Sequence, residues 1–206
     1  ERDLVGIYLS AHPLDEYRVI LENVCSVRMV DFYNLTPLQN CDLVMGGIVT
    51  AVREGYTKTG KPFGIAKVED YSGASEFAFF GNEWIEKKNF FSVGMFLYMK
   101  GKCQPKQWKQ NELEVKVNSI ELLPDVKDEV IEKLTVSAPL NEISDEFIEE
   151  FSSLVKANPG NVSLHFYVKD EEGQHVTLTS RDLKISLHKD IIAYLKAQTM
   201  LSYKIN

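Results

Sequence analysis

The stretch from residue 43 to residue 123 constrains the fold of this 206-residue chain most strongly. It contains five runs rich in Val, Ile, Phe and Tyr, with partial alternation of apolar and polar residues, as expected of half-buried β-strands. Turn-forming residues, including Gly, Pro, Asn and Ser, separate the runs. The expected strands are 43–54, 63–70, 74–80, 94–103 and 111–123, with a short helix over 83–91 between the third and the fourth.

Five strands with a helix between the third and the fourth is the order of the OB-fold, a small Greek-key barrel. One face of such a barrel, with the loops that flank it, binds nucleic-acid strands. Asn82 is expected to cap the helix, and Trp84, Ile85 and Phe91 are expected to close one end of the barrel.

The residues on either side of the barrel predict two further parts. Residues 1–42 read as a helical connector, broken at His12-Pro13, followed by a linker without chemistry of its own. Residues 129–206 predict a small α+β domain with strands at 129–138 and 183–188, a helix capped by Ser144, a hairpin, a second helix and a closing strand. We therefore expect a mainly β chain of three parts, 1–42, 43–123 and 129–206. The buried stripe of the first tail helix is expected to be Phe147, Ile148, Phe151, Leu154 and Val155.

Composition argues against several classes of protein. No run of about 18 apolar residues is present, so no membrane span or membrane partner is expected. The three cysteines are far apart and form no CxxC pair, and the four histidines lack metal-ligand spacing, so neither a disulfide framework, a metal site nor a cofactor is predicted. We expect a reducing, cytoplasmic location. Because the first residue is Glu1, we expect the chain to be a piece of a longer protein.

The distribution of charge favours nucleic-acid binding by the barrel alone. The chain has a net charge of −7, yet residues 43–123 contain eleven basic and nine acidic residues. The acidic excess therefore lies outside the barrel, and only the barrel is compatible with a phosphate backbone.

Basic and aromatic residues gather where an OB-fold binds its ligand. Lysines supply point charges for phosphates, and aromatic rings supply stacking surfaces for bases, so the predicted contact would not be sequence-specific. The alternative is that the loops are solvated and the rings cover a core edge or a protein partner. The predicted nucleic-acid-binding residues are Arg53, Tyr56, Lys58 and Lys61 from the first loop, Lys102, Lys106, Trp108 and Lys109 from the loop between the last two strands, and Phe63 and Lys67 from the second strand.

Two segments resemble a known family. Tyr8-Leu9-Ser10 followed by His12-Pro13-Leu14-Asp15 resembles the segment that precedes the OB domain in the alpha subunit of bacterial DNA polymerase III, although Ala11 stands where many members have glycine. The pattern of Thr57-Lys58-Thr59-Gly60-Lys61-Pro62 and Val68-Glu69-Asp70 is similar to the OB domain of that subunit, and also to anticodon-binding domains of some aminoacyl-tRNA synthetases. The first segment favours the polymerase.

The resemblance implies a function for each part. It implies that the barrel binds single-stranded template DNA and that the tail binds the tau subunit of the clamp loader. The tail resembles the C-terminal domain of the polymerase subunit only loosely, mainly in its helix pattern and at residues 157–160. The parent would be a DNA-directed DNA polymerase, but no closely spaced aspartates suited to two-metal catalysis are present, so this fragment is expected to be non-catalytic and to act with the rest of the polymerase chain. The alternatives are a protein-interaction module without DNA binding, or an RNA-binding appendage of an enzyme such as a synthetase.

Overall fold

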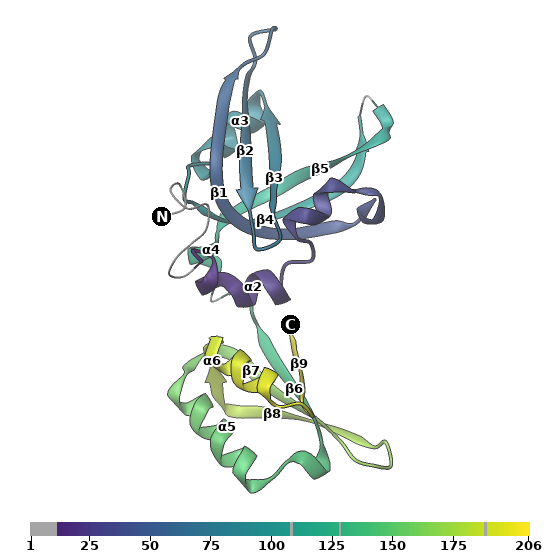
Figure 1. Ribbon diagram of the computed structural model, residues 1–206, viewed down its shortest axis with the longest axis vertical. Coiled ribbons are helices and arrows are strands. Elements are labelled where there is room, and N and C mark those ends of the chain that lie inside the picture. Colours follow the sequence, from purple (N-terminus) through teal and green to yellow (C-terminus); the bar gives the residue numbers. More distant parts are fainter. Residues whose placement is uncertain (1–11, 108, 128, 188) are drawn as a thin grey trace. The chain divides into compact units, whose positions relative to one another are not determined.

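A computed structural model describes residues 12–107, 109–127, 129–187 and 189–206 (Figure 1). Contacts divide the chain into two compact units. The barrel unit includes Cys25–Val126, and the tail unit includes Lys127–Asn206.

The barrel unit is built on one five-stranded antiparallel sheet of order β3-β2-β1-β4-β5. β1 is long enough to pair with β4 up to Ile48 and with β2 from Ile48 onward, and a bulge between Val49 and Ala51 lies where it changes partner. With a helix between β3 and β4, this order confirms the predicted OB-fold. The strands are β1 (Asp42–Tyr56), β2 (Pro62–Glu69), β3 (Ala74–Phe80), β4 (Phe96–Lys106) and β5 (Lys109–Leu122).

Trp84 and Phe91 fill one end of the barrel core, as predicted. Trp84 lies on α3 (Asn82–Lys87), which continues into the 3-10 helix η4 (Lys88–Phe90), and its ring stacks on Phe91 with centroids 6.0 Å apart. A Cβ atom added at Gly64 would lie 2.4 Å from the Trp84 ring, so this glycine makes room for the indole.

Two details of the predicted helix are wrong. Asn82 does not cap it, because Gly81, with φ of +59°, occupies the N-cap position and Asn82 is the first helical residue. Ile85 does not close the barrel, because its side chain is 53% exposed while the neighbouring Trp84 faces the core. Successive helix residues project about 100° apart, and in this short helix Trp84 takes the direction of the core while Ile85 points to solvent.

The segment before β1 packs against the barrel rather than acting as a simple linker. Its 3-10 helix η2 (Met29–Tyr33) is tied to the β2–β3 turn, because the Met29 amide donates to Asp70 Oδ2 at 2.8 Å and the Val30 amide donates to Ser72 Oγ at 3.1 Å. The other short elements around the barrel are η1 (Asp15–Tyr17), α2 (Arg18–Asn23), η3 (Thr36–Leu38) and α4 (Leu123–Val126).

Hydrogen bonds attach the turn at His12-Pro13 to the barrel. Asp15 accepts hydrogen bonds from the His12 amide at 3.1 Å, from Arg18 at 2.7 Å and from the Tyr71 hydroxyl at 2.8 Å. The bonds from Arg18 and Tyr71 hold the pKa of Asp15 below its usual value, whereas burial raises the pKa of Tyr71. Residues 1–11, which include the rest of the resembling segment, lie outside the described residues.

The tail unit confirms the predicted small α+β fold. Its sheet has the order β8-β7-β6-β9, in which β6 and β7 are parallel and the other neighbours antiparallel. No helix in the described ranges combines the length and hydropathy needed to cross a membrane. The elements are β6 (Lys133–Pro139), η5 (Leu140–Glu142), α5 (Asp145–Ala157), β7 (Pro159–Lys169), β8 (His175–Ile185), α6 (Lys189–Ala197) and β9 (Ser202–Ile205).

The helix cap, the buried residues and the strand bounds predicted for the tail are only partly right. Ser144 caps α5 as expected, since its hydroxyl accepts from the Phe147 amide at 3.1 Å. Ile148 is 48% exposed, so its place in the buried stripe is wrong, whereas Phe151 and Val155 are buried. The first tail strand begins at Lys133 rather than at 129. The separate strand predicted over 183–188 does not form, because residues 183–185 are the end of β8, which stops at Ile185.

Candidate nucleic-acid interface

The outer surface of β1, β2 and β3 is the face on which an OB-fold binds its ligand. Residues on this face alternate with the core residues Gly64, Ala66 and Val68 of β2. Neighbouring strands bring the outward residues into cross-strand rows, which we call the outer face. The rows are Ala51, Lys67 and Glu76; Arg53, Ile65 and Ala78; and Gly55, Phe63 and Phe80.

An aromatic pair occupies one end of the outer face. Phe63 and Phe80 are cross-strand partners whose ring centroids are 6.1 Å apart, and Phe80 is 55% exposed. Phe80 was missed by sequence reasoning. Its signal was the doublet Phe79-Phe80, because consecutive strand residues point to opposite faces and both cannot enter the core.

The β1–β2 hairpin extends beyond this pair and exposes Lys58 and Lys61 at its end. The turn is ordered, since the Thr57 amide donates to the Lys61 carbonyl at 2.8 Å and the Lys61 amide donates to Thr57 Oγ1 at 3.0 Å. Gly60 adopts φ of +78°, a conformation that favours glycine. Tyr56 is exposed but alternates with Gly55, so it lies on the opposite side of the hairpin from Phe63.

The β4–β5 connection places two lysines around one carboxylate. Lys106 Nζ lies 2.7 Å from Glu112 Oε2, and Lys109 Nζ lies 2.9 Å from Glu112 Oε1. Hydrogen bonds from Lys106 and then Lys109 lower the pKa of Glu112, and the same carboxylate raises the pKa of Lys106. Trp108, between the two strands, lies outside the described residues.

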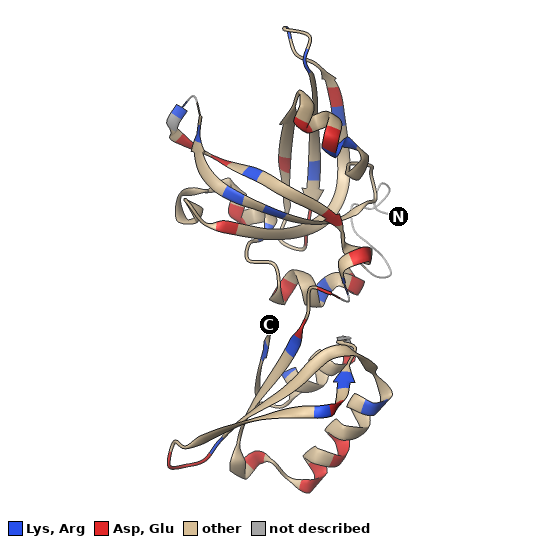
Figure 2. Ribbon diagram, turned by 180° about the vertical axis from the view of Figure 1, so that it is seen from behind, with Lys and Arg blue, Asp and Glu red and all other residues tan. Residues whose placement is uncertain are grey.

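Lys102 is not in this connection, so its predicted placement in the loop is wrong. It lies within β4, four residues before the strand ends, where it pairs with Lys116 of β5 and Asp42 of β1. Figure 2 shows the basic positions along β4 and β5 in blue.

The structure thus brings together part of the predicted set. Arg53, Phe63 and Lys67 share the outer face, and Lys67 and Lys106 line one cavity. In the described ranges, no ion pair engages the side chains of Arg53, Lys58, Lys61 or Lys67. These four cations are therefore available to an anionic ligand.

The side chains that could ligate a metal ion do not cluster in the described parts of the chain. Within them, no group of three or more His, Cys, Asp or Glu side chains is arranged to hold a metal ion. The cysteines are free, and burial raises the pKa of the Cys25 thiol to about 12, so it stays protonated.

Comparison with known proteins agrees with this geometry. Residues 43–123 match the family model described as OB-fold nucleic acid binding domain, and residues 134–206 match that of the DNA polymerase III alpha subunit, C-terminal domain. Similar proteins include the DNA polymerase III alpha subunits of Haemophilus influenzae (25% identity over 84% of this chain and 15% of the relative), Borreliella burgdorferi (24% over 91% and 16%) and Vibrio cholerae (26% over 81% and 14%). The chain spans about a seventh of the length of these relatives. Its sequence and its two domains therefore resemble the C-terminal region of the bacterial DNA polymerase III alpha subunit.

Proposed function

We propose that this chain is a non-catalytic C-terminal part of a replicative DNA polymerase, and that its barrel binds single-stranded template DNA. The observation that carries the proposal is the outer face, where the Phe63–Phe80 pair is followed along the strands by Arg53 and then by Lys67, and leads in the other direction to the lysines of the β1–β2 hairpin. Nucleotidyl transfer would take place in another part of the intact protein.

The physical basis is a combination of stacking and charge. Every base offers a π-face to an exposed ring, and stacking contributes about 1–3 kcal/mol per base. Unpaired lysines neutralise phosphates and release counterions, which makes binding depend on salt rather than on sequence. The barrel would therefore hold a passing strand without selecting its bases.

For the tail unit, we propose docking to the tau subunit of the clamp loader in the bacterial cytoplasm. Support comes from the family match over residues 134–206 and from the acidic surface of α5, where Asp145, Glu146, Glu149 and Glu150 are exposed. Such a surface repels a phosphate backbone and suits a protein partner with basic residues. A pull-down of tau by the whole chain tests this assignment, and loss of capture when Glu146 and Glu149 are changed to lysine would support it.

Removing three lysines tests the DNA assignment. Changing Lys58, Lys61 and Lys106 to alanine is expected to weaken binding of oligothymidylate and to flatten the dependence of log K on log salt by up to about 2, at roughly 0.7 per lost phosphate contact. Fluorescence anisotropy at several salt concentrations measures both quantities. The matched control changes three exposed tail lysines, Lys156, Lys169 and Lys184, and should leave the slope unchanged. A slope that is the same in both variants, or a preference for structured RNA, contradicts the proposal.

Glu112 is expected to weaken DNA binding in the native protein, because it holds Lys106 and Lys109. Glu112→Gln removes one negative charge and frees both ammonium groups, so the affinity for oligothymidylate should rise by about two- to fivefold at low salt, in line with the strength of exposed ion pairs. The gain should disappear at high salt. Glu149→Gln, which makes the same chemical change on α5, serves as the control, and an unchanged or reduced affinity of Glu112→Gln would show that these lysines do not meet the DNA.

A further inference from the structure

β3 and β5 are the two end strands of the five-stranded sheet, and no ladder of backbone hydrogen bonds joins them in the described residues. Two adjoining cavities, of about 760 and 720 Å³, lie along this seam. We call them together the β3–β5 groove. The residues that line both cavities are Ala78, Phe79, Phe80, Glu114, Val115 and Val117.

The larger cavity has an apolar floor and aromatic walls. Phe79 and Val117, both buried, belong to the barrel core, so the groove reaches the core. Phe80 forms one wall, and Tyr33 of η2 contributes another ring. Tyr33 is 78% exposed, and its hydroxyl donates to the Ala74 carbonyl at 3.3 Å. Exposed rings beside an opening of this kind offer stacking surfaces to a planar ligand.

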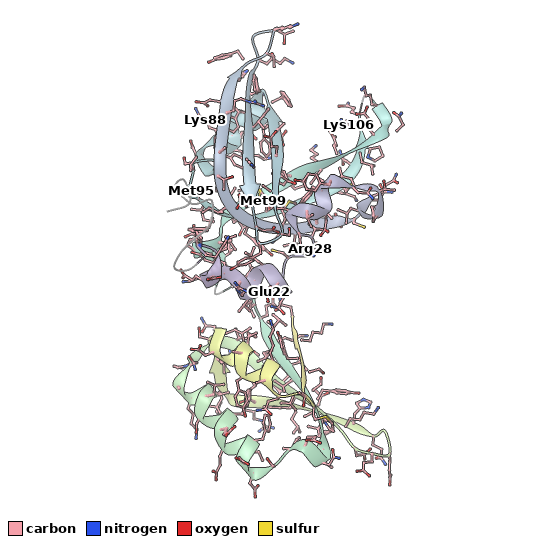
Figure 3. All side chains as sticks on the ribbon, in the orientation of Figure 1. Glu22, Arg28, Lys88, Met95, Met99 and Lys106 are labelled. Atoms are coloured by element: carbon pink, nitrogen blue, oxygen red, sulfur yellow. The ribbon has the colours of Figure 1, made fainter. Side chains whose placement is uncertain are left out.

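Charged groups of both signs line the same cavity. Lys67 projects from β2, and Lys106 lies at the end of β4, where Figure 3 labels it. The acidic groups that line it are Glu76, the cross-strand partner of Lys67, and Glu114 of β5. Lys67 has no ion-pair partner in the described residues, whereas Lys106 is held by Glu112.

We propose that the β3–β5 groove accepts one base of the bound strand, unstacked from its neighbours, with Phe80 as its stacking partner and with Lys67 near a phosphate farther along the groove, toward Tyr33. This inference rests on the proposed function and extends it, because it adds a base pocket to a surface otherwise expected to hold the strand only from outside. It also gives η2, which sequence reasoning treated as part of a linker, a role in binding.

Continuity with the outer face favours a base over a peptide. Phe80 and Lys67 belong both to the outer face and to the groove, so a strand that stacks on Phe63 and Phe80 already lies at the opening. An extended peptide that paired with the free edges of β3 and β5 would be the other occupant of such a seam. The lysines and exposed rings at its border match a nucleotide better.

An abasic scan of a short oligonucleotide tests the base pocket. The probe is an oligothymidylate of about eight nucleotides, within the site size of an OB-fold, in which each position in turn is made abasic. For the wild-type chain, loss of the base at one position is expected to weaken binding by about tenfold, and losses elsewhere less. In Phe80→Ala and in Ala78→Ile, which fills the groove from an exposed strand position, this position should lose its special effect.

The outcomes separate the pocket from the proposed function. If Ala78→Ile keeps the abasic profile of the wild type while a variant with only Lys58 and Lys61 changed to alanine binds the intact probe weakly, the base pocket is refuted and the barrel still binds DNA outside the groove. If the lysine variant is also unaffected, the proposed function fails as well. Ala78→Ile leaves every side chain of the core in place. Its abasic profile therefore tests the base pocket even if Phe80→Ala unfolds. A flat abasic scan for the wild-type chain would likewise overturn the pocket.

Discussion

Replacing Trp84 with alanine is expected to lower the free energy of unfolding of the barrel unit by about 3–5 kcal/mol. The indole is 4% exposed, stacks on Phe91 and fills the space left by Gly64. Alanine would leave a cavity at the end of the core that the rigid β2 backbone cannot close. Because the chain has two compact units, hydrogen exchange of the amides of β2 and β3 measures the effect better than a single global transition.

The neighbouring residue provides the control. Ile85→Ala removes apolar atoms from the same helix, but the side chain is largely exposed, and its effect should stay within about 0.5 kcal/mol. If the amides of β2 and β3 lose the same protection from hydrogen exchange in both variants, burial of Trp84 does not stabilise this end of the barrel.

Asp70→Ala is expected to cost about 3 kcal/mol and also to weaken oligonucleotide binding, because this carboxylate joins η2 to the β2–β3 turn. Asp70 Oδ2 accepts from the Met29 amide at 2.8 Å, and Oδ1 accepts from the Ser72 amide at 2.7 Å, the Ser72 hydroxyl at 2.6 Å and the Gly73 amide at 3.1 Å. Without these bonds the β2–β3 turn would hold η2 less firmly, and Tyr33 would be less well placed in the groove.

Hydrogen exchange of the Met29 and Val30 amides measures the loosening of η2, and fluorescence anisotropy measures the affinity for the oligonucleotide. Asp42→Ala removes an exposed carboxylate of β1 and should change the stability by no more than about 0.5 kcal/mol. Protected Met29 and Val30 amides in Asp70→Ala would show that other contacts hold η2. In that case the affinity should not change either.

Much of the fold was predictable because its signals are local. Alternation of apolar and polar residues indicated each of the five barrel strands, and the helix between β3 and β4 completed the OB order. In the tail, Ser144 was recognisable as a cap because its hydroxyl needs only an amide three residues away. These features depend on chemistry within a few residues.

The candidate site was predicted less completely, because binding residues meet through strand pairing. The lysines and Phe63 were found from their places near the expected loops, but Phe80 and Tyr33 became visible only when β3 lay beside β2 and η2 beside β3. Lys102 was assigned to the loop although it lies within the expected strand 94–103, and the structure shows that β4 continues past it to Lys106. The role of these residues in DNA binding stays a prediction.

The sequence by itself determined the succession of strands and helices in the barrel, the helix cap at Ser144 and the concentration of basic residues in the barrel. Only the tertiary structure decided which of Trp84 and Ile85 enters the core, which residue of the Phe79-Phe80 pair faces outward, and that β3 and β5 border an open groove. The physical reason is that hydrogen bonds and periodicity act along a few residues of chain, whereas packing and strand register are set by partners far away in the sequence.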